Sequence, residues 1–196
     1  PAAEREPAYT GTPWTIRLAG GPRFGSGDEF GGTDWWMSLS TLRATSTRVR
    51  WGVELGYLGH RSETLTFTLA SREGEAVFIT NVFERRMWNV SLVAARVVGS
   101  GDRPGGYILA SAGAYPYWEA MNTTRVGDAP DVVFPREVSE IGTTPYPGVG
   151  LGMGGVWRLG SSVGMGFDTR LHLVVGAGDG LGIPLATVGG TVWMGR

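Results

Sequence analysis

The sequence predicts an all-β fold, an eight-stranded antiparallel up-and-down transmembrane β-barrel. Residues that alternate with a period of two are common along the chain, whereas the longer period of an amphipathic helix is scarce. Turn-forming residues divide the alternating stretches into segments of strand length. Within these segments, charged residues share a face with glycine, which indicates that the polar face is the inner face of a barrel.

The segment 161–175 shows this sharing of a face most clearly. One set of alternate residues is apolar and includes Phe167 and Leu171, whereas the other contains glycines, Asp168 and Arg170. A soluble sheet would bury the apolar set, but a membrane barrel turns it toward lipid and encloses the polar set. Glycine weakens a solvent-exposed strand and fits a crowded, curved interior. We therefore expect the apolar set to face lipid.

The eight expected strands cover most of the chain after a short lead-in. They are about 14–24, 34–43, 49–60, 87–98, 105–118, 147–158, 162–175 and 184–195. Their connections alternate between short turns, at 44–48, 99–104 and 159–161, and generally longer loops, at 25–33, 61–86, 119–146 and 176–183. This alternation is typical of a barrel that crosses an outer membrane with both termini in the periplasm.

The two longest connections, 61–86 and 119–146, are expected to lie outside the membrane. The runs ETLTFTLAS and EAVFITNVF alternate well enough to extend the third and fourth strands beyond the membrane, and a ten-stranded barrel is the alternative. The span 119–146 is rich in Asp, Pro, Thr and Arg, so we expect an exposed loop. Residues 1–13 form a polar, proline-punctuated lead-in, and 14–196 form one barrel domain.

The composition excludes several classes of function. A net charge of -1 and the lack of a basic stripe argue against nucleic-acid binding. The chain has no cysteine, which excludes disulfides and thiol metal sites. No apolar run approaches the roughly 20 residues of a membrane-spanning helix. We expect neither a cofactor nor a metal site.

Charged residues of the polar face are expected to form a network in the lumen. An unpaired buried charge is very costly, so these side chains should join in hydrogen-bonded ion pairs. An eight-stranded barrel is narrow enough for side chains to fill it, which makes a wide diffusion pore improbable. The candidate lumen residues are Arg17, Arg50, Glu54, Arg158, Asp168, Arg170 and His172.

Aromatic residues near the strand ends are expected to form two girdles at the membrane interfaces. The alternative is that they are the core aromatics of a β-sandwich or a soluble barrel. The candidate girdle residues are Trp14, Trp35, Trp51, Tyr57, Trp88, Tyr107, Tyr115, Tyr117, Trp157 and Trp193.

Two segments resemble the small outer-membrane β-barrel family related to the OmpA transmembrane domain, among the porin-like barrels. They are MWNVSLVAARVVGSGDRPGGYILASAGAYPYW and GVGLGMGGVWRLGSSVGMGFDTRLHLVV. In the second segment Arg170 matches an arginine that is frequent near the end of an aliphatic strand. The resemblance implies a location in the bacterial outer membrane. Such barrels commonly end on an aromatic residue, whereas this chain ends WMGR, with Trp193 the nearest aromatic.

The expected function is structural or interactive, with the long loops as the binding surface. Partners would be outer-membrane lipid and another envelope or surface protein. One alternative is a lipid A deacylase of the PagL type, with His60 or His172 paired to a serine or carboxylate at the rim. The deacylase pattern places serine two residues after histidine, where this chain has Val174. The second alternative is a soluble barrel that binds a small ligand.

The run GLGMGG, residues 150–155, matches the spacing of a dinucleotide-binding loop. Such a loop needs a strand before it and a helix after it, and the sequence around this run predicts only strands. We therefore interpret it as a glycine-rich strand that packs tightly inside the barrel.

Overall fold

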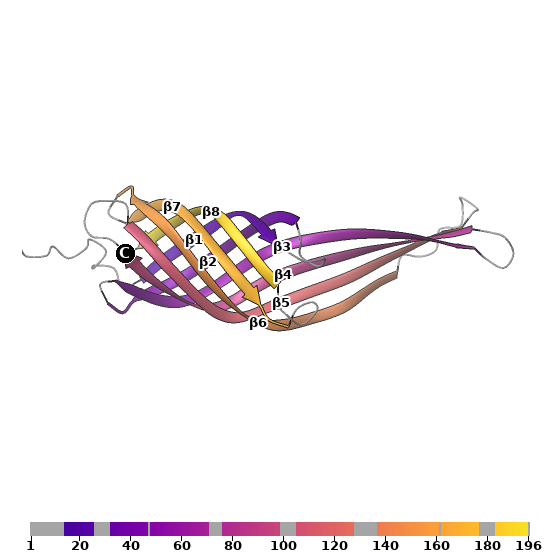
Figure 1. The fold of residues 1–196 in the computed structure, drawn as a ribbon, viewed down its shortest axis with the longest axis horizontal. Helices are drawn as coiled ribbons and strands as arrows, with labels where there is room; N and C mark the ends of the chain where they lie inside the picture. The colour runs from indigo at the N-terminus through magenta and orange to yellow at the C-terminus, as the bar shows by residue number, and fades with distance from the viewer. Residues whose placement is uncertain are drawn as a thin grey trace, which may run out of the picture.

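The computed structural model describes residues 14–25, 32–46, 48–70, 76–98, 105–127, 137–160, 162–176 and 183–195. The strands β1 to β8 pair antiparallel in chain order, and β8 pairs with β1 to close the barrel (Figure 1). The predicted fold class is confirmed, with eight strands in the closed barrel. The expected lead-in 1–13 and the final residue, Arg196, lie outside the described residues. The strands are β1 (Trp14–Gly25), β2 (Gly32–Ala44), β3 (Val49–Ala70), β4 (Ala76–Val98), β5 (Gly105–Gly127), β6 (Glu137–Arg158), β7 (Val163–Val174) and β8 (Ile183–Gly195).

The strands fall into two length classes. β1, β2, β7 and β8 have 12 or 13 residues, whereas β3 to β6 have 22 or 23. The four long strands continue past one end of the barrel as a narrow sheet, which we call the projecting sheet (Figure 1). We call this end the extension end, and the opposite end, where short turns join β2 to β3 and β6 to β7, the turn end.

The projecting sheet corrects one expectation and fits another. The span 61–86 extends the third and fourth strands, as expected, around residues 71–75, which lie outside the described part. The span 119–146 was expected to be a loop, but β5 continues to Gly127 and β6 begins at Glu137. A single two-stranded hairpin is marginally stable in water, so β5 and β6 support the extension of β3 and β4 by adding two more strands.

Two irregularities mark the junction between the barrel and the projecting sheet. The pairing register shifts between Tyr57 and Gly59 in β3, and between Glu119 and Ala120 in β5. Gly59 has a positive φ of 128°, and a Cβ there would lie 2.6 Å from an Asp34 carboxylate oxygen. Bulges increase the local twist of a strand, and a glycine tolerates this backbone conformation. Gly59 therefore permits the backbone conformation that the junction requires.

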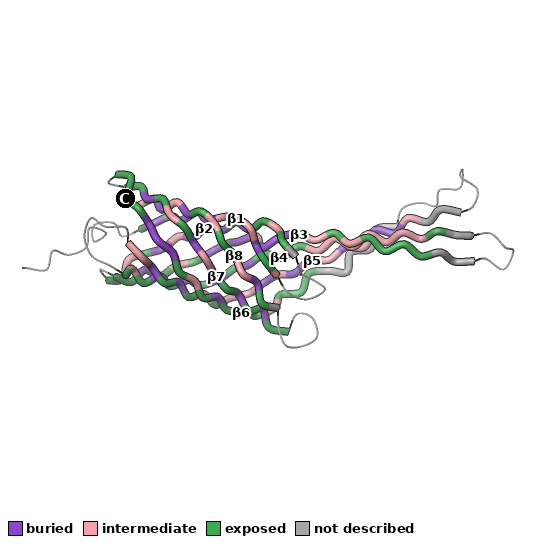
Figure 2. Tube along the Cα trace, turned by 45° about the horizontal axis from the view of Figure 1, so that its top comes forward, coloured by how far each residue is buried: buried purple, intermediate pink, exposed green. Residues whose placement is uncertain are grey.

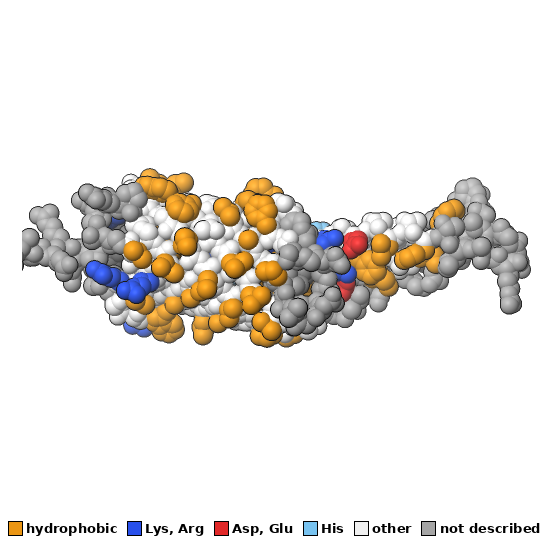
Figure 3. Space-filling model, in the orientation of Figure 1, with side chains coloured by type: hydrophobic (Ala, Val, Ile, Leu, Met, Phe, Trp, Pro, Cys, Tyr) orange, Lys and Arg blue, Asp and Glu red, His pale blue; other side chains and the backbone are white. Residues whose placement is uncertain are grey.

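Exposed and buried residues alternate along the barrel strands (Figure 2). The exposed set is apolar: Leu39, Leu55 and Leu171 are 45%, 58% and 56% exposed. Hydrophobic side chains are spread over the visible face of the barrel in Figure 3. Arg17 and Asp168, in contrast, are fully buried. This arrangement suits a lipid exterior and opposes the soluble barrel, which would need the apolar set inside.

Among the described residues, no helix is long and apolar enough to cross a membrane.

Aromatic side chains cluster on the outer wall near both barrel ends. Toward the turn end lie Trp14, Trp51 and Trp157, about half exposed. Toward the extension end, Trp35 is 70% exposed, and Trp88 packs edge-on against Tyr57 with ring centroids 4.9 Å apart. These six residues occupy positions suited to interfacial girdles.

Four predicted girdle residues do not lie on the outer wall. Tyr107, Tyr115, Tyr117 and Trp193 are at most 8% exposed and point into the barrel, so their assignment to the girdle is wrong. The physical reason is the glycine-rich wall of β6, which leaves space that large side chains fill. A Cβ at Gly148 would lie 2.5 Å from the Tyr115 ring. In β5 and β8 both alternate sets contain apolar residues, so polarity does not distinguish the faces.

Replacement of Leu171 by arginine should disrupt the barrel's membrane insertion. An arginine on the lipid face near the membrane centre costs about 2–4 kcal/mol of folding free energy. Urea titrations of the protein in phospholipid vesicles, followed by tryptophan fluorescence, would measure this loss. Leu171→Val is the matched control and should change the free energy by less than about 1.5 kcal/mol. Equal stability of Leu171→Arg and the wild type would contradict the lipid-facing assignment.

Candidate functional site

Four charged side chains meet at the middle of the lumen, and we call them the charged layer: Arg17 of β1, Glu54 of β3, and Asp168 and Arg170 of β7. Arg170 Nη1 donates to both Glu54 oxygens, at 2.7 and 2.8 Å, and Arg170 Nε donates to Asp168 Oδ1 at 2.9 Å. Arg17 Nη1 donates to Glu54 Oε2 at 3.0 Å, and Arg17 Nη2 pairs with Asp168. Two guanidinium groups thus balance two carboxylates.

Neutral side chains complete the hydrogen bonding of the two carboxylates. Ser40 Oγ donates to Glu54 Oε2 at 2.7 Å and accepts from Arg17 at 2.9 Å. The Tyr107 hydroxyl donates to Asp168 Oδ2 at 3.0 Å. Asn89 Nδ2 lies 3.4 Å from Glu54 Oε1. Charges taken out of water need such partners, and both carboxylates of the layer have them.

Two apolar layers enclose the charged layer. Arg170 lies 5.5 Å from the ring of Trp36 on the extension side, and Arg17 lies 5.9 Å from the ring of Trp193 on the turn side. Each guanidinium therefore also has a cation–π contact. The extension-side layer contains Ala19, Trp36, Leu58, Met87, Tyr115, Tyr117, Val174 and Leu185, and the turn-side layer contains Leu42, Val93, Ala95, Tyr107, Leu109, Val156 and Trp193.

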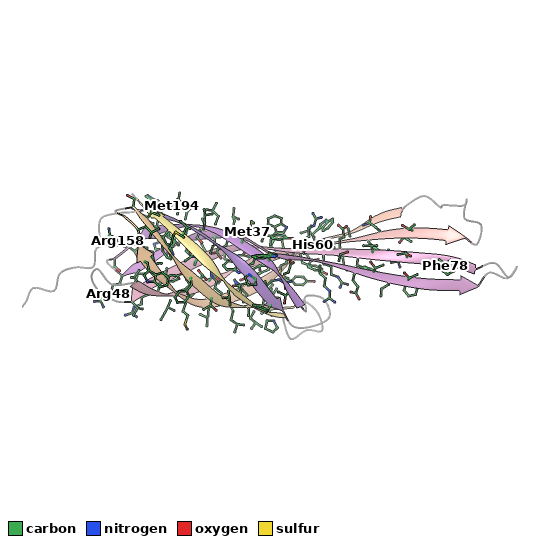
Figure 4. All side chains as sticks on the ribbon, turned by 90° about the horizontal axis from the view of Figure 1, so that it is seen from above. Met37, Arg48, His60, Phe78, Arg158 and Met194 are labelled. Carbon is green, nitrogen blue, oxygen red and sulfur yellow. The ribbon has the colours of Figure 1, made fainter. Side chains whose placement is uncertain are left out.

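The other predicted lumen residues lie outside the charged layer. Arg50 is buried toward the turn end, where Nη1 donates to Thr15. His172 is buried toward the extension end, with Nδ1 3.1 Å from the Tyr115 hydroxyl. Arg158 is exposed at the turn end (Figure 4), so its assignment to the lumen is wrong. Arg158 lies two residues after the inward-facing Val156, so alternation predicts that it faces inward too. It is, however, the last residue of β6, where the barrel opens to solvent.

Sequence reasoning missed the neutral members of the site. Ser40, Asn89 and Tyr107 are uncharged, and a single strand does not show which charge they will meet across the barrel. Ser40 lies in register with Glu54, so the pairing of β2 with β3 brings them together. The alternation of inward and outward side chains was the available signal, because Asn89 shares the inward face of its strand with Ser91.

The two histidines lie in different surroundings. Asp168 bonds to arginines and Tyr107, and His172 bonds to Tyr115, so the two do not form a relay. His60 is exposed where the barrel meets the projecting sheet (Figure 4), and its backbone N–H donates to Asp34. The described residues also contain no group of His, Cys, Asp and Glu that could hold a metal ion.

A row of ion pairs crosses the base of the projecting sheet. Arg85 of β4 lies between Glu63 of β3, at 3.5 Å, and Glu119 of β5, at 2.9 Å. On the opposite face of the sheet, Arg86 lies 4.9 Å from the ring of Trp118. Cross-strand pairs of this kind hold neighbouring strands in register. The sheet therefore emerges from the barrel as an ordered element.

The fold is similar to that of solved bacterial surface proteins. Neisserial surface protein A (NspA) matches with a TM-score of 0.62 and 9% identity, over 94% of this chain and 98% of its own. Two structures of Ail, the attachment invasion locus protein of Yersinia pestis, match with 12% identity over 92% of this chain and 96% of theirs. The TM-score is 0.38 for the complex with the heparin analogue sucrose octasulfate and 0.42 for the other structure. No protein-family model and no curated protein matches the sequence.

The match to NspA shows the class of fold, a small eight-stranded outer-membrane β-barrel. This is the fold that the sequence resemblance implied. The fold and the apolar outer wall together support the predicted location in the bacterial outer membrane.

Removal of one carboxylate from the charged layer should destabilise the barrel strongly. Glu54→Gln leaves Arg17 and Arg170 with one carboxylate, and breaking a buried ion pair costs about 3–5 kcal/mol. Glu84→Gln, which loses a partly exposed contact of 3.5 Å with Arg86, should cost less than about 1 kcal/mol. Urea titrations in phospholipid vesicles would compare the two variants. Equal losses would contradict the role of the charged layer.

Proposed function

We propose that the protein is an outer-membrane anchor of interaction type, whose projecting sheet is the binding surface outside the cell. The observation that carries this proposal is the contrast between a filled lumen and four strands that continue well beyond the barrel. The barrel holds the chain in the membrane, and the sheet presents side chains and backbone beyond it. The turn end then faces the periplasm.

The filled lumen argues against a diffusion pore. A solute would have to cross both apolar layers and the charged layer between them, where Glu54 and Asp168 are already bonded to arginines. Moving through would break buried ion pairs without water to replace them. The lumen therefore serves stability in this proposal.

Outer-membrane lipid is the partner of the barrel wall in this proposal. A groove of about 560 Å³ crosses the outside of the wall between two rows of apolar side chains. Its size and apolar lining suit an acyl chain. One row contains Leu18, Leu39, Leu55 and Val90, and the next contains Met37, Tyr57 and Trp88.

The projecting sheet carries apolar side chains where no lipid covers them. Leu65, Phe67 and Phe78 are 40%, 48% and 42% exposed (Phe78 is labelled in Figure 4). Exposed apolar groups beyond the membrane mark surfaces for contact with other molecules. An envelope or surface protein is the class of partner that this surface supports.

A chain without the projecting sheet should fold but lose contact with other cells. Arg61 pairs with Arg85 and Glu119 with Gly142, so Asn-Gly turns can replace 62–84 and 120–141. Bacteria that carry the full or shortened chain would be compared for retention on cultured animal cells and for clumping in suspension. We expect the full chain to raise at least one signal and the shortened chain to lose it.

The control is the gel mobility of unheated and boiled samples, which reports whether the shortened barrel is folded. A folded, shortened chain that is retained and clumps as strongly as the full chain would contradict the proposed function. Absence of both signals with the full chain would contradict it as well.

A further inference from the structure

The outer edge of β3 is the feature of the projecting sheet that points to a particular partner. β2 pairs with β3 only as far as Met37 and Tyr57, whereas β4 pairs with β3 up to Ala70. Among the described strands, residues 60–70 of β3 thus have a neighbouring strand on one side only. Backbone donors and acceptors along such an edge are available to an added strand.

The other edge of the projecting sheet is protected, and the edge of β3 is not. β6 carries Glu137, Glu140 and Pro145 along the edge that β7 leaves uncovered, and both charges and proline oppose strand addition. Proline cannot donate a backbone hydrogen bond, so it blocks strand addition. From Thr64 to Ala70, β3 reads TLTFTLA, with neither a charge nor a proline. The two edges therefore differ in the feature that controls strand pairing.

The sequence along the β3 edge is complementary to itself. In an antiparallel pair, residues directly opposite each other lie on the same face of the sheet. If Thr66 of one copy lies opposite Thr66 of another, Leu65 faces Phe67 and Thr64 faces Thr68. Leu65 and Phe67 then meet on one face and threonines on the other, and the next pair outward on the apolar face sets Glu63 opposite Leu69. Leu65 and Phe67 are 40% and 48% exposed in the single chain, so this contact would bury them.

We propose that the partner of the β3 edge is a second copy of this chain, paired antiparallel about Thr66. The two projecting sheets then join into one continuous sheet. Antiparallel strands point the two barrels in opposite directions, so the copies lie in two facing membranes. Parallel copies in one membrane, related by a two-fold axis along the strands, would turn one sheet over and set threonines against Leu65 and Phe67.

The spacing of the two membranes follows from the strand geometry. The barrel ends near Gly59, and Thr66 lies seven residues further along the strand. At about 3.3 Å per residue, the two barrel ends are separated by about 45 Å. The contact thus links neighbouring cells, and it deepens the proposed function, on which it rests, by naming the partner.

A charge-swap experiment tests this pairing, because Thr66 lies on the symmetry axis. Thr66→Lys and Thr66→Glu each place like charges opposite one another, whereas a mixture places opposite charges together. Phospholipid vesicles that carry each protein would be followed by light scattering. We expect wild-type vesicles to cluster, each variant alone to lose clustering, and the mixture of the two variants to regain it.

The matched control is Thr144→Lys, because Thr144 is an exposed threonine of the opposite edge strand, β6, where β7 no longer pairs with it. Vesicles with this variant should cluster like the wild type. The chain has no cysteine, so Thr66→Cys provides a second readout. Oxidation should convert this variant to disulfide-linked dimers in clustered vesicles, whereas Thr144→Cys should remain monomeric.

Three outcomes would overturn the proposed pairing: wild-type vesicles that do not cluster, single-charge variants that cluster normally, or a mixture that stays dispersed. The comparison of full and shortened chains distinguishes this failure from that of the proposed function. If the full chain promotes cell retention and the shortened chain does not, the sheet binds another partner and only the self-pairing is wrong.

Discussion

The structure depends on the free-energy cost of placing charged groups inside a barrel whose outer wall is apolar. Arg17, Glu54, Asp168 and Arg170 come from three strands, and the chain separations between the ion-pair partners reach 151 residues. Because the layer is neutral and its carboxylates are fully bonded, closure of the barrel brings together partners that no single hairpin could supply. This makes the charged layer a specific tie between β1, β3 and β7.

The layers around these charges fill the barrel, whereas its extension is available for contact. Trp36 and Trp193 cover the two arginines from opposite sides, which limits access of water to the ion pairs. Beyond the barrel, β3 loses β2 as a neighbour and β6 loses β7, which leaves two strand edges. The same four strands therefore contribute to a closed wall at one level and to an open sheet at the next.

Most of the fold could be predicted because the polarity of alternate residues is clear in β3 and β7. There, Glu54 and Asp168 share a face with glycines, so the inward face was evident from the sequence. The prediction failed for Tyr107 and Tyr115 because both faces of β5 are largely apolar or small. Their side chains turn inward to fill the space beside the β6 glycines, which becomes visible only when the two strands are paired.

The candidate site was predictable to the extent that its charges lie on recognisable strands. Arg158 was wrongly assigned to the lumen because the alternation of side chains does not show where the enclosed part of a strand ends. The span 119–146 was misread because its polar composition resembles that of a loop. Its strand structure depends on pairing with β4, which a local reading of the sequence does not include.

Conductance across a planar lipid bilayer tests most directly the central claim that paired charges and apolar layers close the barrel. The wild-type protein should insert without steady conductance. A variant with Arg17, Trp36, Arg170 and Trp193 replaced by alanine, if folded by gel mobility, should show discrete conductance steps, because the guanidinium groups and both covering rings are gone. Steady ion flow through the wild type would contradict the account.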